Sequence, residues 1–129
     1  MIPAAFEYMV ADSAEAAIAA LAEHGDEAKL LAGGHSLIPL MRFRLAAPAM
    51  LVDIGRLADL SYIKDADDHI AIGALTKHRT LETSDLLAAE APLVRHVAGE
   101  VGDPSVRHRG TLGGSLAHGD PASDLPAAL

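Results

Sequence analysis

The sequence contains no cysteine. This absence excludes disulfide bonds, zinc or iron–sulfur centres held by thiolates, and a cysteine nucleophile. Because nothing else in the sequence calls for an oxidising compartment, we expect a cytoplasmic location. The chain must use other groups for any redox chemistry in which it takes part.

Aromatic residues are also scarce, although half of the 129 residues are apolar: there are two Phe, two Tyr and no Trp. Small apolar side chains, mainly alanine, suit helices packed closely on a sheet better than an aromatic-rich sandwich or barrel. No apolar run approaches the roughly 18 residues of a membrane span, and the first residues lack the pattern of a signal peptide. The composition therefore predicts an α+β fold with no membrane span.

Positive charge is in short supply, with 10 Lys and Arg against 18 Asp and Glu and a formal net charge of −8. Nucleic-acid binding requires a basic stripe that displaces counterions, whereas the densest basic cluster here is Arg107–Arg109. We therefore expect no nucleic-acid partner. An acidic chain that binds an anionic cofactor would have to hold it through backbone N–H groups.

Apolar spacing predicts one amphipathic helix near the N-terminus, after an extended segment over residues 1–10. Asp12 is its predicted N-cap, with Glu15 three residues later, and Gly25 is its predicted C-terminal stop. The buried face is predicted at positions i, i+3, i+4 and i+7, which are Ala14, Ala17, Ile18 and Leu21.

The other elements are predicted from short apolar runs and their breakers. We expect a buried strand over 28–31, a short helix over 37–43, a strand over 50–54, hairpin strands over 62–64 and 69–72, a helix from about 80 to 89, a helix after Pro92, and a loop over 102–105. The chain stops just after a further helix begins, which predicts a fragment. A weak boundary near residues 55–60 divides it into lobes at 1–57 and 58–129.

Two glycine-rich segments carry the strongest functional signal. Gly33-Gly34-His35-Ser36 follows a predicted strand, and Gly113-Gly114-Ser115 follows Thr111. Glycine permits positive φ and close approach, and consecutive N–H groups turned to one side bind anions. Neither segment has the GxGxxG or GK[ST] pattern, which disfavours Rossmann and P-loop folds. One such segment alone is typical of a tight turn. Two of them in an acidic chain favour a nucleotide.

The remaining polar residues give weaker signals. Seven histidines occur without a helical HxxxH pair, so no metal site is predicted. His35 is interpreted as a loop residue whose backbone faces the cofactor. Asp120 and Asp124 could form an acid/base pair, contact a ligand or cap the terminal helix. No His–Asp arrangement accompanies the serines, so no catalytic residue is assigned.

The segment Leu31–Met41, LAGGHSLIPLM, resembles the first flavin-binding segment of the FAD-carrying medium subunit of molybdenum hydroxylases. The aerobic carbon-monoxide-dehydrogenase type is the most similar. The likeness continues through Arg42–Leu45, Leu51–Ile54, Tyr62–Ile63, Ile70–Ala74, Gly102–Pro104 and Arg107–Gly114. It therefore spans nearly the whole chain in register, and AGGHS and TLGGS are far more specific together than either is alone.

The resemblance implies a two-lobed α+β FAD-binding domain of the vanillyl-alcohol-oxidase and CO-dehydrogenase flavoprotein type, with the second lobe incomplete. The implied cofactor is FAD, with its pyrophosphate held largely by backbone amides. Asp124 matches an acid that hydrogen-bonds the polyhydroxyl chain of the flavin. The implied cofactor-binding residues are Ala32, Gly33, Gly34, His35, Ser36, Thr111, Leu112, Gly113, Gly114, Ser115 and Asp124.

The same resemblance implies the function of an oxidoreductase subunit that is inactive on substrate alone. A large partner subunit would carry molybdopterin, and a small one would carry two [2Fe–2S] clusters. FAD would pass electrons from these clusters to an acceptor, and the absence of cysteine agrees with this division of labour. Two alternatives remain open: an interaction fragment that binds no flavin, and a stand-alone FAD oxidoreductase of the same fold.

Overall fold

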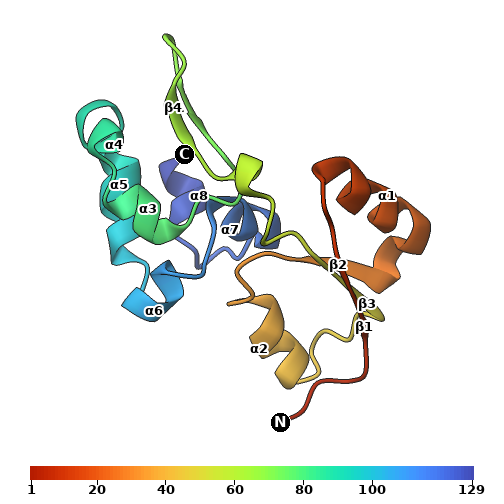
Figure 1. The fold of residues 1–129 in the computed structure, drawn as a ribbon. Helices are drawn as coiled ribbons and strands as arrows, with labels where there is room; N and C mark the ends of the chain where they lie inside the picture. Colours follow the sequence, from red (N-terminus) through yellow and green to blue (C-terminus); the bar gives the residue numbers. More distant parts are fainter. The chain divides into compact units, whose positions relative to one another are not determined.

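A computed structural model describes all 129 residues, which form two compact units, Met1–Ala58 and Asp59–Leu129. Figure 1 draws the first unit from red to yellow-green and the second from green to blue. Their identity as lobes of one FAD-binding domain stays a prediction. None of the helices combines the length and apolar character needed to cross a bilayer.

The first unit is built on a three-stranded parallel sheet in the order β1-β3-β2. The strands are β1 (Glu7–Val10), β2 (Ala28–Leu31) and β3 (Met50–Asp53). Their last residues are in register, with both Val10 and Leu31 opposite Asp53. All three strands therefore end at one edge of the sheet, where the loop after β2 begins.

Helix α1 (Ala14–His24) packs on this sheet through alanines, and a 3₁₀ turn (Gly25–Glu27) leads from it into β2. The buried residues of this core are Ala11, Ala17, Ala20, Ala28 and Val52. The predicted buried position Ile18 is wrong, because its side chain is 66% exposed. Strand 28–31 is also less buried than predicted, since β2 is an edge strand and only Ala28 is fully covered.

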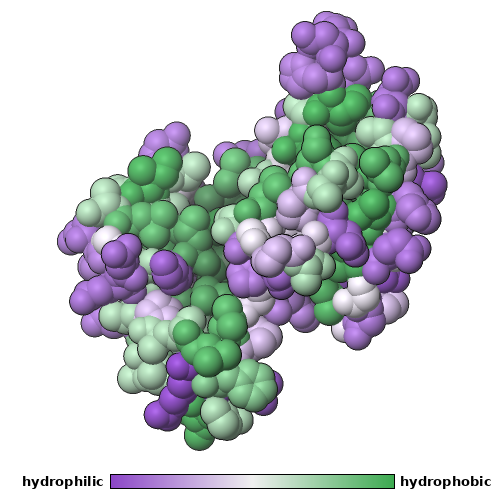
Figure 2. All heavy atoms as spheres, turned by 180° about the vertical axis from the view of Figure 1, so that it is seen from behind, coloured by the Kyte–Doolittle hydropathy of each residue, from purple (hydrophilic) through white to green (hydrophobic).

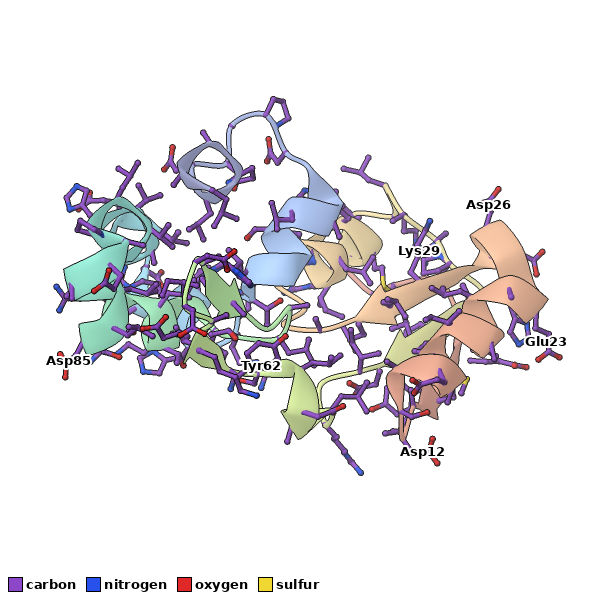
Figure 3. The ribbon with its side chains drawn as sticks, turned by 90° about the horizontal axis from the view of Figure 1, so that it is seen from above. Asp12, Glu23, Asp26, Lys29, Tyr62 and Asp85 are labelled. Atoms are coloured by element: carbon purple, nitrogen blue, oxygen red, sulfur yellow. The ribbon has the colours of Figure 1, made fainter.

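The N-cap of α1 is Ser13, so the prediction of Asp12 is wrong. Ser13 has an extended backbone, and its hydroxyl accepts the N–H of Ala16 at 3.0 Å. Asp12 lies one residue too early for this bond, and its carboxylate points away from the helix (Figure 3). Helix α2 (Leu37–Arg42) completes the first unit close to its predicted bounds.

The second unit combines a hairpin with short helices. The antiparallel hairpin joins β4 (Ile63–Asp65) to β5 (Ile70–Ile72), and a 3₁₀ turn (Ala58–Leu60) precedes it. The helices are α3 (His78–Glu82), α4 (Asp85–Glu90), α5 (Pro92–Glu100), α6 (Pro104–Arg107), α7 (Leu112–His118) and α8 (Leu125–Ala128). They share a core with the isoleucines of the hairpin: Leu81, Leu87, Val94, Ala98, Leu112 and Leu125 are its buried members.

Side-chain caps divide this unit more finely than the sequence predicts. The single helix expected from 80 to 89 is two helices, because the Ser84 hydroxyl accepts the N–H of Leu87 at 3.2 Å and starts α4. The loop expected over 102–105 contains the start of α6, since the Asp103 carboxylate accepts the N–H groups of Ser105 and Val106. Local capping bonds therefore override the apolar spacing.

Apolar side chains also reach the surface, as the green areas of Figure 2 show. The large exposed ones include Ile2, Phe43, Leu45, Leu93 and Leu116. Val94 and Ala98 form the inward face of α5, whereas Leu93 on the same helix is 59% exposed. The apolar residues are thus divided between the cores of the two units and the protein surface.

Leu87→Ala tests the core of the second unit. The Leu87 side chain is 0% exposed, so its truncation should lower the free energy of unfolding by about 2–5 kcal/mol. Leu93→Ala is the matched control, because Leu93 is 59% exposed and should change the free energy by less than about 0.5 kcal/mol. Urea denaturation measures both, and equal losses would contradict this core.

Candidate functional site

The first glycine-rich segment, Ala32–Ser36, is a loop between the end of β2 and the start of α2. Gly34 has φ +79°, a left-handed conformation that side chains other than glycine rarely adopt. A Cβ at Gly34 would also lie 3.1 Å from Cγ1 of Ile38. The local geometry therefore requires glycine at this position, as the sequence predicts for a loop that approaches another group closely.

The backbone amides of this loop are unpaired within the protein. The carbonyls of Gly34 and Ser36 accept the N–H groups of Ile38 and Leu40, at 3.0 and 3.3 Å, but the N–H groups of Gly33–Ser36 have no acceptor in the chain. The Ser36 hydroxyl makes no capping bond, and His35 and Ser36 are exposed. Four successive free donors after a strand are available to an anion without a charged side chain.

The turn after β3 adjoins this loop. The N–H of Ile54 donates to the carbonyl of Leu31 at 3.0 Å, at the residue that precedes the loop. The Asp53 carboxylate accepts the N–H of Gly55 at 2.8 Å and the phenol of Tyr8, and this second bond raises the pKa of Tyr8. Sequence reasoning assigns no role to this pair, because the cross-strand contact follows only from the parallel register.

The second glycine-rich segment is not a loop. It forms the first turn of α7, with Thr111 as the N-cap, and its amides are all used in the fold. The N–H groups of Leu112 and Gly113 donate to the carbonyls of Thr76 and Ala74, and those of Gly114 and Ser115 donate to the hydroxyl and carbonyl of Thr111. The expectation of a second amide cradle is therefore wrong.

Gly113 is required by packing. A Cβ on Gly113 would lie 2.7 Å from both the Cβ and the carbonyl oxygen of Ala74. This segment therefore needs glycine so that α7 can lie against the backbone of residues 74–76. Towards a ligand it offers the exposed Gly114 and the partly buried hydroxyl of Ser115, whereas Thr111 and Leu112 are buried.

His78 lies directly behind Ser115, and sequence reasoning did not single it out. Its imidazole is buried, and burial lowers the pKa of the ring, which favours the neutral form. The Nε2 atom is 3.4 Å from the Ser115 hydroxyl, and Nδ1 has no partner. Only the tertiary structure brings these residues together, since they are 37 positions apart.

The acidic residues near the C-terminus divide into one engaged and one free carboxylate. Asp120 accepts the N–H of Ala122 at 2.9 Å. Asp124 occupies the N-cap position of α8, as the cap interpretation expects, but its side chain makes no capping bond and its carboxylate is exposed. Its contact with a flavin stays a prediction. No group of three or more His, Asp or Glu side chains is placed to hold a metal ion.

Gly113→Ala tests the packing role of this glycine. Alanine normally stabilises a helix by up to about 1 kcal/mol relative to glycine. Here overpacking against Ala74 should instead destabilise the chain by about 1–3 kcal/mol in urea denaturation. Gly102→Ala is the control, because its Cβ would meet nothing within 4 Å. A stabilised Gly113→Ala variant would contradict the close contact.

Comparisons with known proteins agree with the resemblance seen in the sequence. Residues 4–129 match the family described as the FAD binding domain in molybdopterin dehydrogenase. The chain is 49% identical over 129 residues to the alpha subunit of the 6-hydroxypseudooxynicotine dehydrogenase complex of Paenarthrobacter nicotinovorans, covering 100% of this chain and 44% of the relative. It is 46% identical over 127 residues to the carbon monoxide dehydrogenase medium chain of Hydrogenophaga pseudoflava, covering 98% and 44%.

The fold agrees as well. The structure of reconstituted CO dehydrogenase from Oligotropha carboxidovorans matches with a TM-score of 0.96 and 45% identity, over 98% of this chain and 44% of that chain. The chain thus spans less than half the length of the curated relatives it matches. The predicted resemblance is confirmed, and so is FAD as the cofactor of the family. The chain belongs to the family of FAD-binding domains of molybdopterin dehydrogenases.

Proposed function

We propose that this chain is the FAD-binding part of a molybdenum hydroxylase medium subunit, in which FAD carries electrons from a [2Fe–2S] partner to an acceptor. The observation that carries the proposal is the row of four unpaired N–H groups over Gly33–Ser36. Membership of the FAD-binding family supports the nature of the ligand, and both relatives are named as one subunit or chain of a dehydrogenase.

In this proposal the Ala32–Ser36 loop holds the pyrophosphate of FAD. Backbone donors suit a chain of net charge −8, because they bind phosphate oxygens without a cationic side chain. The Ser36 hydroxyl adds a further free donor. His35 contributes through its backbone N–H, which has no acceptor in the chain.

In the second unit the proposal assigns different roles to the predicted residues. Ser115 and Gly114 are accessible and would contact the cofactor, while Thr111, Leu112 and Gly113 hold the first turn of α7 in place. The free carboxylate of Asp124 would accept hydrogen bonds from the polyhydroxyl chain of the flavin. No side chain is assigned to bond making or breaking.

Bound FAD supplies the redox chemistry, and the protein supplies binding and orientation. The chain has no thiolate that could hold a cluster, so the proposal places the [2Fe–2S] clusters in a small partner subunit. A molybdopterin-containing large subunit would oxidise the substrate. The subunit would thus take part in an oxidoreductase without acting on the substrate itself.

FAD titration of the purified chain tests the binding site. The wild-type chain should bind one FAD, and Gly34→Val should weaken binding about 10- to 100-fold, because a β-branched residue disrupts the loop and one or two charge-assisted hydrogen bonds are lost. Gly25→Val is the matched control: Gly25 also has positive φ in the same unit but lies outside the loop. Flavin fluorescence and absorbance measure the binding.

Equal weakening in both variants would contradict a site at the loop and would indicate a general effect of strained backbone. A folded wild-type chain that binds no FAD would favour the alternative of an interaction fragment without flavin. Circular dichroism of each variant establishes that it is folded.

Anaerobic mixing tests the electron route. The flavin of the loaded chain should lose its oxidised absorbance when a reduced [2Fe–2S] subunit is added. Candidate organic substrates added without partner subunits should leave the absorbance unchanged, since the proposal places substrate oxidation in the large subunit. Direct reduction of the flavin by such a substrate would contradict the subunit role and favour a stand-alone oxidoreductase.

A further inference from the structure

The imidazole of His78 is fixed tightly beneath the first turn of α7. His78 is only 3% exposed, and its backbone N–H donates to the carbonyl of Gly110 at 3.1 Å. A Cβ on Gly110 would lie 2.7 Å from Cδ2 and 2.8 Å from Nε2 of the ring. The ring therefore has little freedom to turn away, and Nε2 stays beside the hydroxyl of Ser115.

The surroundings of the two ring nitrogens decide which one carries the proton. A neutral imidazole has one N–H, and Nδ1 is buried without any partner. A proton on Nδ1 would leave a buried donor without an acceptor, which is rare in folded proteins. A proton on Nε2 donates to Oγ of Ser115 at 3.4 Å and leaves only a lone pair unpaired. The Nε2–H form is therefore favoured.

We propose that His78 is a positioning residue for Ser115: it donates from Nε2 to the serine oxygen and turns the hydroxyl hydrogen away from the interior, ready to donate to an oxygen of the cofactor. The identity of that cofactor rests on the proposed function. His78 itself touches no ligand in this arrangement, and its effect passes through one hydroxyl group.

The helix context of Ser115 supports this assignment. A helical serine commonly directs its hydroxyl back to the carbonyl four residues earlier. Here that carbonyl, of Thr111, accepts only the N–H of Ser115, and the hydroxyl contacts His78 instead. The Nε2–H of His78 donates to a lone pair of the Ser115 Oγ, and the hydroxyl hydrogen stays available to donate to a ligand. Ser115 then resembles the free amides of the first unit: it is a neutral donor without an internal acceptor.

The tautomer of His78 is measured directly by ¹⁵N–¹H NMR of the imidazole in the purified chain. We expect a neutral ring protonated at Nε2 at pH 7.5, with a change in the Nε2 signal in Ser115→Ala. A proton on Nδ1, or a charged ring, would overturn the assignment. This measurement needs no FAD, so its outcome is independent of the proposed function.

FAD titration of four variants tests the consequence for binding. Ser115→Ala and His78→Asn should each weaken FAD binding about 2- to 10-fold, and the double variant should be no weaker than either. His78→Gln should keep wild-type affinity, because the Gln amide reaches the place of Nε2, whereas the Asn amide reaches only that of Nδ1. Urea midpoints of His78→Asn and His78→Gln check that the two are similarly stable.

Equal weakening by Gln and Asn, or additive losses in the double variant, would overturn the positioning role and leave His78 as a packing residue. A wild-type chain that shows the Nε2–H tautomer but binds no FAD would instead contradict the proposed function and leave the His78–Ser115 contact standing.

Discussion

The need of every buried backbone N–H for an acceptor gives the two glycine-rich segments opposite roles. In the second unit, the N–H groups of Leu112 and Gly113 donate to carbonyls of residues 76 and 74, and this pairing anchors α7. In the first unit, the amides of Gly33–Ser36 follow an edge strand and remain unpaired at the surface. One segment therefore builds the fold, and the other keeps its N–H groups free for the ligand that the proposed function assigns to it.

Small residues allow helices and backbone segments to pack closely against each other. Ala17 and Ala20 let α1 lie on the sheet, Gly113 lets α7 lie on Ala74, and Gly110 makes room for the ring of His78. The scarcity of aromatic residues thus has a structural consequence: no Phe or Tyr is buried in either core, and leucine, valine and alanine side chains fill the interiors where the backbones approach closely. A methyl group added at either glycine would meet atoms nearer than 3 Å.

Sequence reasoning succeeds where local pattern decides the structure. The apolar run at 28–31 and the glycines after it predict β2 and its loop, because strand length and positive φ depend on neighbouring residues. It fails where an acceptor comes from elsewhere in the chain: the glycines at 113 and 114 suggest a second row of free N–H groups, but bonds to residues 74 and 76 fix them in a helix. His78 is missed for the same reason, since neither its burial nor its contact with Ser115 follows from its neighbours in sequence.

The proposed function requires an acidic chain to hold an anionic cofactor. Donors that carry no formal charge, such as the amides of Gly33–Ser36 and the hydroxyl of Ser115, contribute directional bonds over a short range, and the net charge of −8 acts at longer range and is screened by salt. Affinity built from such donors depends on their exact orientation. A positive φ at Gly34 and a fixed imidazole behind Ser115 are two ways of setting that orientation before the ligand arrives.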